Sequence, residues 1–208
     1  RYTLVSALGH GLDQTFQALR NRRSGLRPCD FEDVGITAYI GRVDGVDDGP
    51  LEGGSVATEL GQFDCRNNRL ALLGLRQDGF IPAAIAAKER YGAHRVAVIL
   101  GSSTSGILET EHAYSHRNPV TGALPLSYLR SYRYTQNMFS SAHFVRAYLG
   151  LRGPAMVIST ACSSSAKVFA TAARFIEAGF CDAVVVGGVD SLCLTTLYGF
   201  ASLGVMSQ

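Results

Sequence analysis

Residues 154–169 read PAMVISTACSSSAKVF. The first part is an apolar run of strand length, and the second part has the small and apolar residues of a helix. Two further apolar runs, RVAVIL at residues 95–100 and DAVVVG at residues 182–187, also lie beside segments of helical character. Runs that are apolar on both faces are typical of strands in a sheet that helices cover. The alternation of strand and helix predicts an α/β fold with a largely parallel sheet.

The rest of the chain fits the same class. Its patterns predict a helix over Leu12–Arg23 and a strand over Thr37–Val43. They also predict a helical stretch over Asn67–Tyr91 that is broken near Asp78-Gly79 and Pro82. Further helices are expected from Ile107 onward and over Thr135–Leu149, Ser163–Ala178 and Leu192–Leu203. Because both ends of the chain look cut, we expect a fragment of a longer protein.

Composition excludes several classes of protein. The chain has 208 residues, of which 47% are apolar, 17% are charged and 23 are glycine. Soluble domains usually carry about 25% charged residues, so we expect other protein to cover much of this surface. A net charge of +2 without a basic stripe argues against nucleic-acid binding, and no apolar run approaches the ~20 residues of a membrane span. Five cysteines without a CxxC pair suggest reduced thiols in the cytoplasm.

Cys162 is the first candidate for chemistry. It follows a buried strand and opens a helix, where the helix dipole and free backbone N–H groups favour the thiolate, the nucleophilic form. Its small neighbours leave room for a substrate. The alternative is that Cys162 is a small buried hydrophobic residue, as free cysteines often are. The residues alone leave both interpretations open.

Several segments together resemble a known family. TACSSSA (160–166), DAVVVGGVD (182–190) and GFASLGVMS (199–207) are similar to segments of the β-ketoacyl-acyl-carrier-protein synthases of the I/II type. The resemblance continues upstream in VSALGHGLDQTFQALRNRRSGL (5–26), FDCRNNRL (63–70) and RVAVILGSSTSGILETE (95–111). LGLRGPAMVISTACSSS (149–165) is the most specific stretch. The segments follow the family's order over nearly the whole chain.

The resemblance implies a fold. Residues 1–208 would form the N-terminal half of a thiolase-like subunit, with a mixed, mostly parallel five-stranded sheet covered by helices. The domain would be truncated at both ends, and the C-terminal half would be absent. In the family that half supplies two histidines, a lysine and a phenylalanine gate, so this piece alone is not expected to condense substrates.

It also implies a reaction. Cys162 would take an acyl group from acyl carrier protein, and a malonyl-carrier thioester would then lose CO2 and attack that group, as in fatty-acid or polyketide elongation. Backbone N–H groups, including that of Cys162, would stabilise the oxyanion. No cofactor of its own is expected, since phosphopantetheine arrives on the carrier protein.

The resemblance suggests further site residues. Thr104, in the loop after the strand at residues 95–100, and Phe200 would line the acyl pocket, with plain packing as the alternative for each. That loop lacks the lysine of a phosphate-binding P-loop. His112 and His116 are one helical turn apart beside glutamates, but their order does not match HExxH, so no metal is expected.

Four arginines are candidates for docking the acidic carrier protein. Arg66 and Arg69 share one helix face, and Arg130 and Arg133 repeat their spacing. Ordinary solvated surface is the alternative for all four. The strand at Pro154–Thr160 would pair with its twin across a two-fold axis, giving a homodimer or a related heterodimer.

Two other functions remain as alternatives. A thiolase shares the fold and the nucleophile but uses CoA. A non-catalytic dimerising subunit, like the chain-length factors that pair with synthases, would lack the cysteine.

Overall fold

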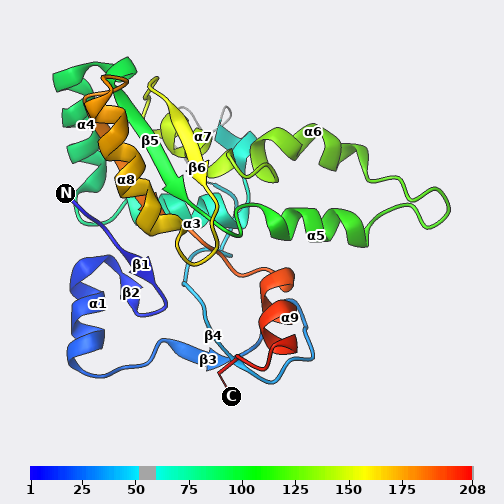
Figure 1. The fold of residues 1–208 in the computed structure, drawn as a ribbon. Coiled ribbons are helices and arrows are strands. Elements are labelled where there is room, and N and C mark those ends of the chain that lie inside the picture. Colours follow the sequence, from blue (N-terminus) through cyan, green and yellow to red (C-terminus); the bar gives the residue numbers. More distant parts are fainter. Residues whose placement is uncertain (52–59, 208) are drawn as a thin grey trace.

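The computed structural model describes residues 1–51 and 60–207. A parallel sheet lies at its centre, formed by β5 (Val96–Gly101), β6 (Ala155–Ile158) and β7 (Ala183–Gly188) in the order β6-β5-β7. β5 and β6 are seen side by side in Figure 1. In its register, Val98 of β5 lies beside Ala155 on one side and Val185 on the other. These strands are the three apolar runs of the sequence, so the α/β class is confirmed.

Helices cover both faces of this sheet. All six residues of β5 are buried, and Val96, Val98 and Leu100 share one core cluster with residues of α3 (Arg66–Leu75), α4 (Phe80–Tyr91) and α7 (Ser140–Tyr148). Ile99 points to the other face and packs on Val168 of α8 (Ser164–Glu177). Because strand side chains alternate between faces, a strand that is apolar at every position must be covered on both.

The helical stretch from residue 67 to 91 breaks at Asp78-Gly79, as predicted, but not at Pro82, which lies in the first turn of α4, where a proline is tolerated. α3 and α4 meet at 81°. Asp78 and Gly79 between them have φ of 55° and 67°, which a continuous right-handed helix does not allow. The predicted helix at Leu12–Arg23 is α1 (Gly11–Arg20), which ends three residues early because Arg22 also adopts a positive φ of 50°.

The sheet is smaller than expected. Its described part has three strands, all parallel, instead of a mixed five-stranded sheet. The other strands form two antiparallel pairs, β1 (Val5–Ser6) with β2 (Gly9–His10) and β3 (Leu26–Pro28) with β4 (Tyr39–Gly41). The strand predicted at Thr37–Val43 is therefore present as β4, but it pairs with β3. These strands are two or three residues long, and none is apolar on both faces as the central strands are.

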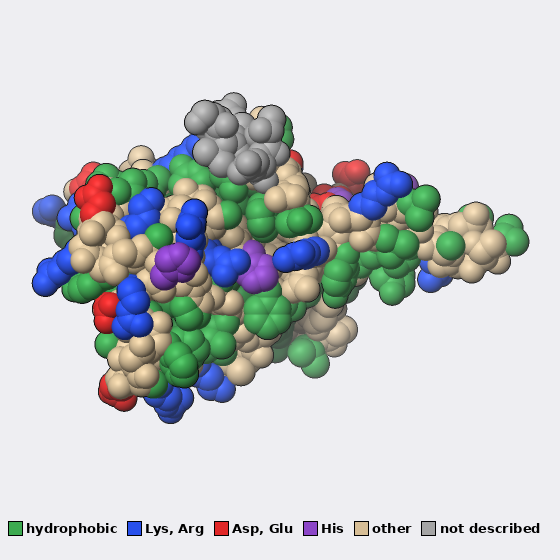
Figure 2. Space-filling model, turned by 90° about the horizontal axis from the view of Figure 1, so that it is seen from above, with side chains coloured by type: hydrophobic (Ala, Val, Ile, Leu, Met, Phe, Trp, Pro, Cys, Tyr) green, Lys and Arg blue, Asp and Glu red, His purple; other side chains and the backbone are tan. Residues whose placement is uncertain are grey.

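The remaining helices extend away from the sheet. α5 (Ile107–Ser115) and α6 (Leu126–Thr135) form an arm that protrudes from the body (Figures 1 and 2). α9 (Leu194–Ser202) packs in a second core cluster, separate from that of the sheet, which includes Ile40 of β4 and Leu108 of α5. Two short 3-10 turns, Gly61–Phe63 and Ala93–Arg95, precede α3 and β5.

No single helix of the described residues is long and apolar enough to cross a membrane. The bent pair α3 and α4 has the necessary length and hydropathy only when the two helices are taken together.

Candidate active site

Cys162 lies in a tight turn between β6 and α8. Ala161 immediately before it has a φ of 53°, in the left-handed region that favours glycine. The hydroxyl of Ser164 accepts a hydrogen bond from the Thr160 N–H at 2.9 Å and donates one to the Ala161 carbonyl at 2.6 Å. These bonds hold the turn closed while the Cys162 side chain stays exposed. Strained backbone of this kind is typical of functional sites.

Two glycines let α8 begin directly over the ends of the strands. A Cβ on Gly101, at the end of β5, would lie 2.5 Å from the backbone nitrogen of Ser165. A Cβ on Gly188, at the end of β7, would lie 2.5 Å from the Cβ of the same serine. Any larger residue would push the helix away, so these glycines place the positive end of a 14-residue helix beside the thiol.

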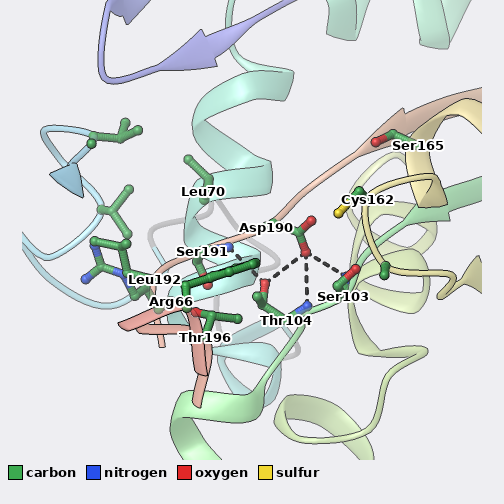
Figure 3. Close-up of a pocket in the computed structure, with 15 residues that line it drawn as sticks. Arg66, Leu70, Ser103, Thr104, Cys162, Ser165, Asp190, Ser191, Leu192 and Thr196 are labelled. Carbon is green, nitrogen blue, oxygen red and sulfur yellow. Dashed lines mark hydrogen bonds between the residues drawn. The ribbon is translucent and has the colours of Figure 1, made fainter. Parts of the chain in front are cut away.

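The thiol faces a pocket of about 540 Å³ (Figure 3). Segments far apart in the sequence build it: the end of β4 and the loop after it, α3, the loop after β5, the Cys162 turn, the loop after β7, and α9. Apolar walls come from residues such as Val46, Leu70 and Phe200. Hydroxyl groups of residues such as Ser103 and Ser165 lie nearer the thiol (Figure 3). The pocket combines space for an apolar group with a polar end at the nucleophile.

Asp190 joins two loops of the pocket wall beside the thiol. Its Oδ1 accepts hydrogen bonds from the backbone N–H groups of Ser103 at 2.7 Å and Thr104 at 3.0 Å. The same oxygen accepts from the hydroxyls of Ser102 at 3.2 Å and Thr104 at 3.0 Å. The Ser191 N–H in turn donates to Oγ1 of Thr104 at 3.0 Å. The loops after β5 and β7 are therefore joined beside the site (Figure 3).

This arrangement agrees with a match to a known family. The profile described as "Beta-ketoacyl synthase, N-terminal domain" matches residues 3–208. The chain belongs to the β-ketoacyl synthase family. It is the family predicted from the sequence.

Curated relatives of this synthase domain are polyketide synthases. A PKS-NRPS hybrid synthetase, acdB of Aspergillus candidus, is 31% identical over 145 residues, which are 67% of this chain and 6% of the synthetase. The phenolphthiocerol synthesis polyketide synthase type I Pks15/1 of Mycobacterium bovis is 35% identical over 104 residues, 49% of this chain and 5% of that protein. The chain thus spans a small part of the length of these relatives.

Solved synthase structures show the same fold. The ketosynthase ApeO of Xenorhabdus doucetiae, solved in complex with its chain length factor ApeC, is 32% identical with a TM-score of 0.76. The alignment covers 99% of this chain and 49% of that one. A β-ketoacyl synthase from Burkholderia phymatum aligns with a TM-score of 0.74 at 22% identity, over 97% of this chain and 48% of that one. The thiolase-like fold is confirmed, and the chain spans about half the length of these synthases.

The structure brings together three residues that the sequence singled out for catalysis and substrate binding. Cys162, Thr104 and Phe200 all line the pocket. Sequence reasoning missed the role of Asp190, although it lies in a segment that carried the resemblance. The available signal was its position, because an acidic residue directly after a buried parallel strand lies at the edge where active sites form.

The four arginines divide into two kinds. Arg66 is buried, lines the Cys162 pocket and forms an ion pair with Asp47, so its place differs from the exposed docking position expected of it. Arg69 is half-buried and binds both carboxylate oxygens of Asp64, at 2.7 and 2.8 Å, which raises the pKa of its guanidinium. Arg130 and Arg133 are exposed on α6.

None of the five cysteines is paired, and their surroundings differ. Burial raises the pKa of the Cys65 thiol to about 12. Burial also raises the pKa of Cys181 and of Cys193. Cys162 is the one exposed cysteine in the described chain, and it alone lines the pocket.

His112 on α5 and His116, directly after the end of this helix, have local partners. His112 lies 3.3 Å from a carboxylate oxygen of Glu32, and Nδ1 of His116 lies 2.7 Å from the carbonyl oxygen of His112. Within residues 1–51 and 60–207, no group of three or more His, Cys, Asp and Glu side chains is placed to hold a metal ion.

Proposed function

We propose that this domain is an acyltransferase that carries an acyl group on Cys162 for chain elongation of the polyketide or fatty-acid type. The observation that carries the proposal is the exposed thiol at the start of α8, inside a pocket with apolar walls. The helix dipole and the N–H groups of the first turn favour a negative charge at this place.

The loading step follows from the geometry. The Cys162 thiolate attacks the carbonyl carbon of an acyl thioester and forms a new carbon–sulfur bond, and the donor thiol leaves with the electrons of the old bond. The tetrahedral intermediate carries an oxyanion, which we assign to backbone N–H groups at the turn, including that of Cys162. The acyl chain extends past Thr104 toward Phe200, and phosphopantetheine comes with the donor.

The second step is the decarboxylative condensation of a malonyl-carrier thioester with this acyl group. Such a step needs groups that stabilise the carbanion as CO2 leaves. No histidine of the described chain lines the pocket. We therefore assign to these residues the loading half of the reaction, and to parts of the whole synthase outside them the groups that promote decarboxylation.

We propose two partners. The first is an acidic acyl carrier protein, for which the exposed Arg130 and Arg133 on α6 are the better-placed arginines, since Asp47 and Asp64 neutralise Arg66 and Arg69. The second is another subunit bound along β6, which is an edge strand of the sheet. That ApeO was solved with its chain length factor supports a related heterodimer, and a homodimer is the alternative.

The test is acyl loading of the natural full-length protein, followed by peptide mass spectrometry. With an acylated carrier protein as donor, we expect the acyl mass on the peptide that contains Cys162, and none in Cys162→Ser. Cys29→Ser is the matched control and should load as the wild type does. Acyl-CoA as the preferred donor would instead support a thiolase, and an acyl-free Cys162 with every donor would contradict the proposal.

A further inference from the structure

Two carboxylates hold the pocket wall that faces the Cys162 turn. Asp190 follows β7 and binds the Ser102–Thr104 loop, which leads into α5. Glu111 lies on α5 and binds the start of α9, the helix that follows Asp190. Its Oε2 accepts from the Leu194 N–H at 2.8 Å, and its Oε1 accepts from the N–H and the hydroxyl of Thr195 at 2.6 and 2.5 Å.

The Glu111 contact compensates for a missing cap. The first N–H groups of a helix have no partner within the helix, and Cys193, which precedes α9, makes no side-chain cap hydrogen bond. A carboxylate at this end satisfies those donors and interacts favourably with the helix dipole. α9 carries Thr196 and Phe200 into the pocket, so Glu111 fixes how this part of the wall lies.

The two contacts are reciprocal. Asp190 reaches from the connection before α9 to the loop before α5, and Glu111 reaches from α5 back to the start of α9. Each carboxylate is thus anchored on one side of the wall and accepts hydrogen bonds from the other side. Neither carboxylate makes a hydrogen bond to the Cys162 turn among the described residues. That turn has its own closing bonds through Ser164, whose hydroxyl also lies 3.4 Å from the Ser103 hydroxyl of the wall.

We propose that Asp190 and Glu111 are positioning residues that set the shape of this wall, and thereby which acyl groups Cys162 accepts. The selectivity part of this proposal rests on the proposed acyl-transfer function. Loss of either carboxylate loosens one side of the wall and leaves the closing bonds of the Cys162 turn intact.

The experiment compares Asp190→Asn and Glu111→Gln with the wild type in the natural full-length protein. The first readout is kcat/KM for loading from acetyl and octanoyl carrier thioesters. Because the negative charge that strengthens these hydrogen bonds is lost, we expect the octanoyl-to-acetyl ratio to change by about tenfold. The second readout is alkylation of Cys162 by iodoacetamide, a small reagent, which should stay within about twofold of the wild type because the turn is intact.

Asp182→Asn is the matched control. Asp182 lies at the opposite end of β7 and binds Arg95 through both carboxylate oxygens, at 2.7 and 2.8 Å. The substitution removes charge-assisted bonds of the same kind far from the pocket. Its octanoyl-to-acetyl ratio should equal that of the wild type, so a general loss of stability is separated from a change in the wall.

A third readout does not depend on acyl transfer. The ratio of the Cys162 alkylation rate by a bulky aromatic maleimide to that by N-ethylmaleimide reports the shape of the wall directly, and we expect it to change in both variants. If the wild type is never acylated but the maleimide ratio changes in both variants, the proposed acyl-transfer function is wrong. The two carboxylates are then positioning residues of the wall without a role in acyl selectivity. An unchanged maleimide ratio in both variants, or an equal change in Asp182→Asn, overturns the inference.

Discussion

At the scale of single residues, the cysteines differ in how readily they should react. A raised pKa lowers the thiolate fraction at a given pH, and for Cys65, with a pKa of about 12, the loss relative to a free thiol is on the order of a thousandfold at pH 7.5. Cys162 is exposed at a helix start. We expect iodoacetamide to label Cys162 first at pH 7.5, well before Cys65, Cys181 and Cys193, as peptide mapping over time would show. Labelling of Cys162 no faster than that of half-buried Cys29 would contradict an activated thiolate.

Glu109 provides a test of stability against pH. The pKa of its carboxyl group is raised, mainly by burial. The charges of Asp64 and Glu32 raise this pKa further, and those of His112 and Arg69 lower it in part. A folded-state pKa above the unfolded value gives stability that is present at low pH and is lost as the pH rises through the folded pKa.

The neutral substitution Glu109→Gln removes this loss. We therefore expect it to raise the melting temperature by roughly 1–3 °C at pH 7 and to have little effect at pH 4. The exposed Glu89→Gln on α4 is the control, and thermal denaturation at both pH values is the measurement. The same shift at pH 4 as at pH 7 would show that ionisation is not the cause.

Local sequence predicts some residue roles and misses others for a physical reason. Cys162 could be predicted because its strand, turn and helix are contiguous. The position of Asp190 after a strand was a signal, but its hydrogen bonds could not be predicted, because the donors lie 86 to 88 residues away. The sequence predicts Arg66 at an exposed docking site, but in the structure this side chain is buried and pairs with Asp47. Asp47 lies in the loop after β4, and nothing in the sequence pattern around Arg66 indicates that this loop covers it.

At the scale of elements, the start of α8 depends on Gly101. Gly101→Ala would place a Cβ 2.5 Å from the backbone of Ser165, so the helix or the strand must shift. We expect a loss of about 1–3 kcal/mol in the free energy of unfolding, together with slower alkylation of Cys162. Gly74→Ala in α3, where a Cβ meets open space, should instead stabilise by about 0.5–1 kcal/mol. Chemical denaturation measures both, and equal effects would contradict the close-approach argument.

The two exposed arginines of α6 lead to a binding prediction. Arg130→Glu with Arg133→Glu should weaken binding of an acidic carrier protein and reduce its salt dependence, since two attractive charges become repulsive. Arg20→Glu with Arg22→Glu, at exposed positions around the end of α1, makes the same change in charge elsewhere and serves as the control. Titration at several salt concentrations gives the slope. An unchanged slope for the α6 pair would move the docking site off this helix.

Elements were predictable where burial imposes a pattern. The three central strands are apolar throughout because helices cover both faces, and the break between α3 and α4 follows from Asp78 and Gly79. β1 and β2 have two residues each, too few for a periodic signal. They pair with each other in a hairpin and do not join the central sheet. The five strands implied by the resemblance are therefore more than the three that the described part of the sheet contains.

At the scale of the whole molecule, the shortage of charge has a structural counterpart. α8 and the turn after it expose the apolar side chains of Phe169, Ile176 and Phe180, at 61%, 45% and 61%. Apolar groups gathered on one helix of this kind are typical of a surface that other protein covers. This agrees with a chain that spans about half the length of the solved synthases.

The free edge of β6 allows the proposed subunit contact to be tested. The Val98 N–H donates to the Pro154 carbonyl and the Ser102 N–H to that of Ile158, so with the parallel register the N–H groups of Met156 and Ile158 point toward β5. The Val157 N–H points outward, where a second subunit would bind.

Val157→Pro removes this outward donor and leaves the bonds to β5 in place, which an edge strand tolerates. We expect the natural full-length protein to dissociate into separate subunits, with a molar mass reduced to that of one chain in light scattering, while the circular dichroism spectrum is retained. Val157→Ala keeps the N–H group and should remain assembled. A strand pairing cannot keep its register when it has lost a central hydrogen bond and the proline ring stands in its path. A Val157→Pro variant that stays assembled would therefore mean that the subunits meet elsewhere.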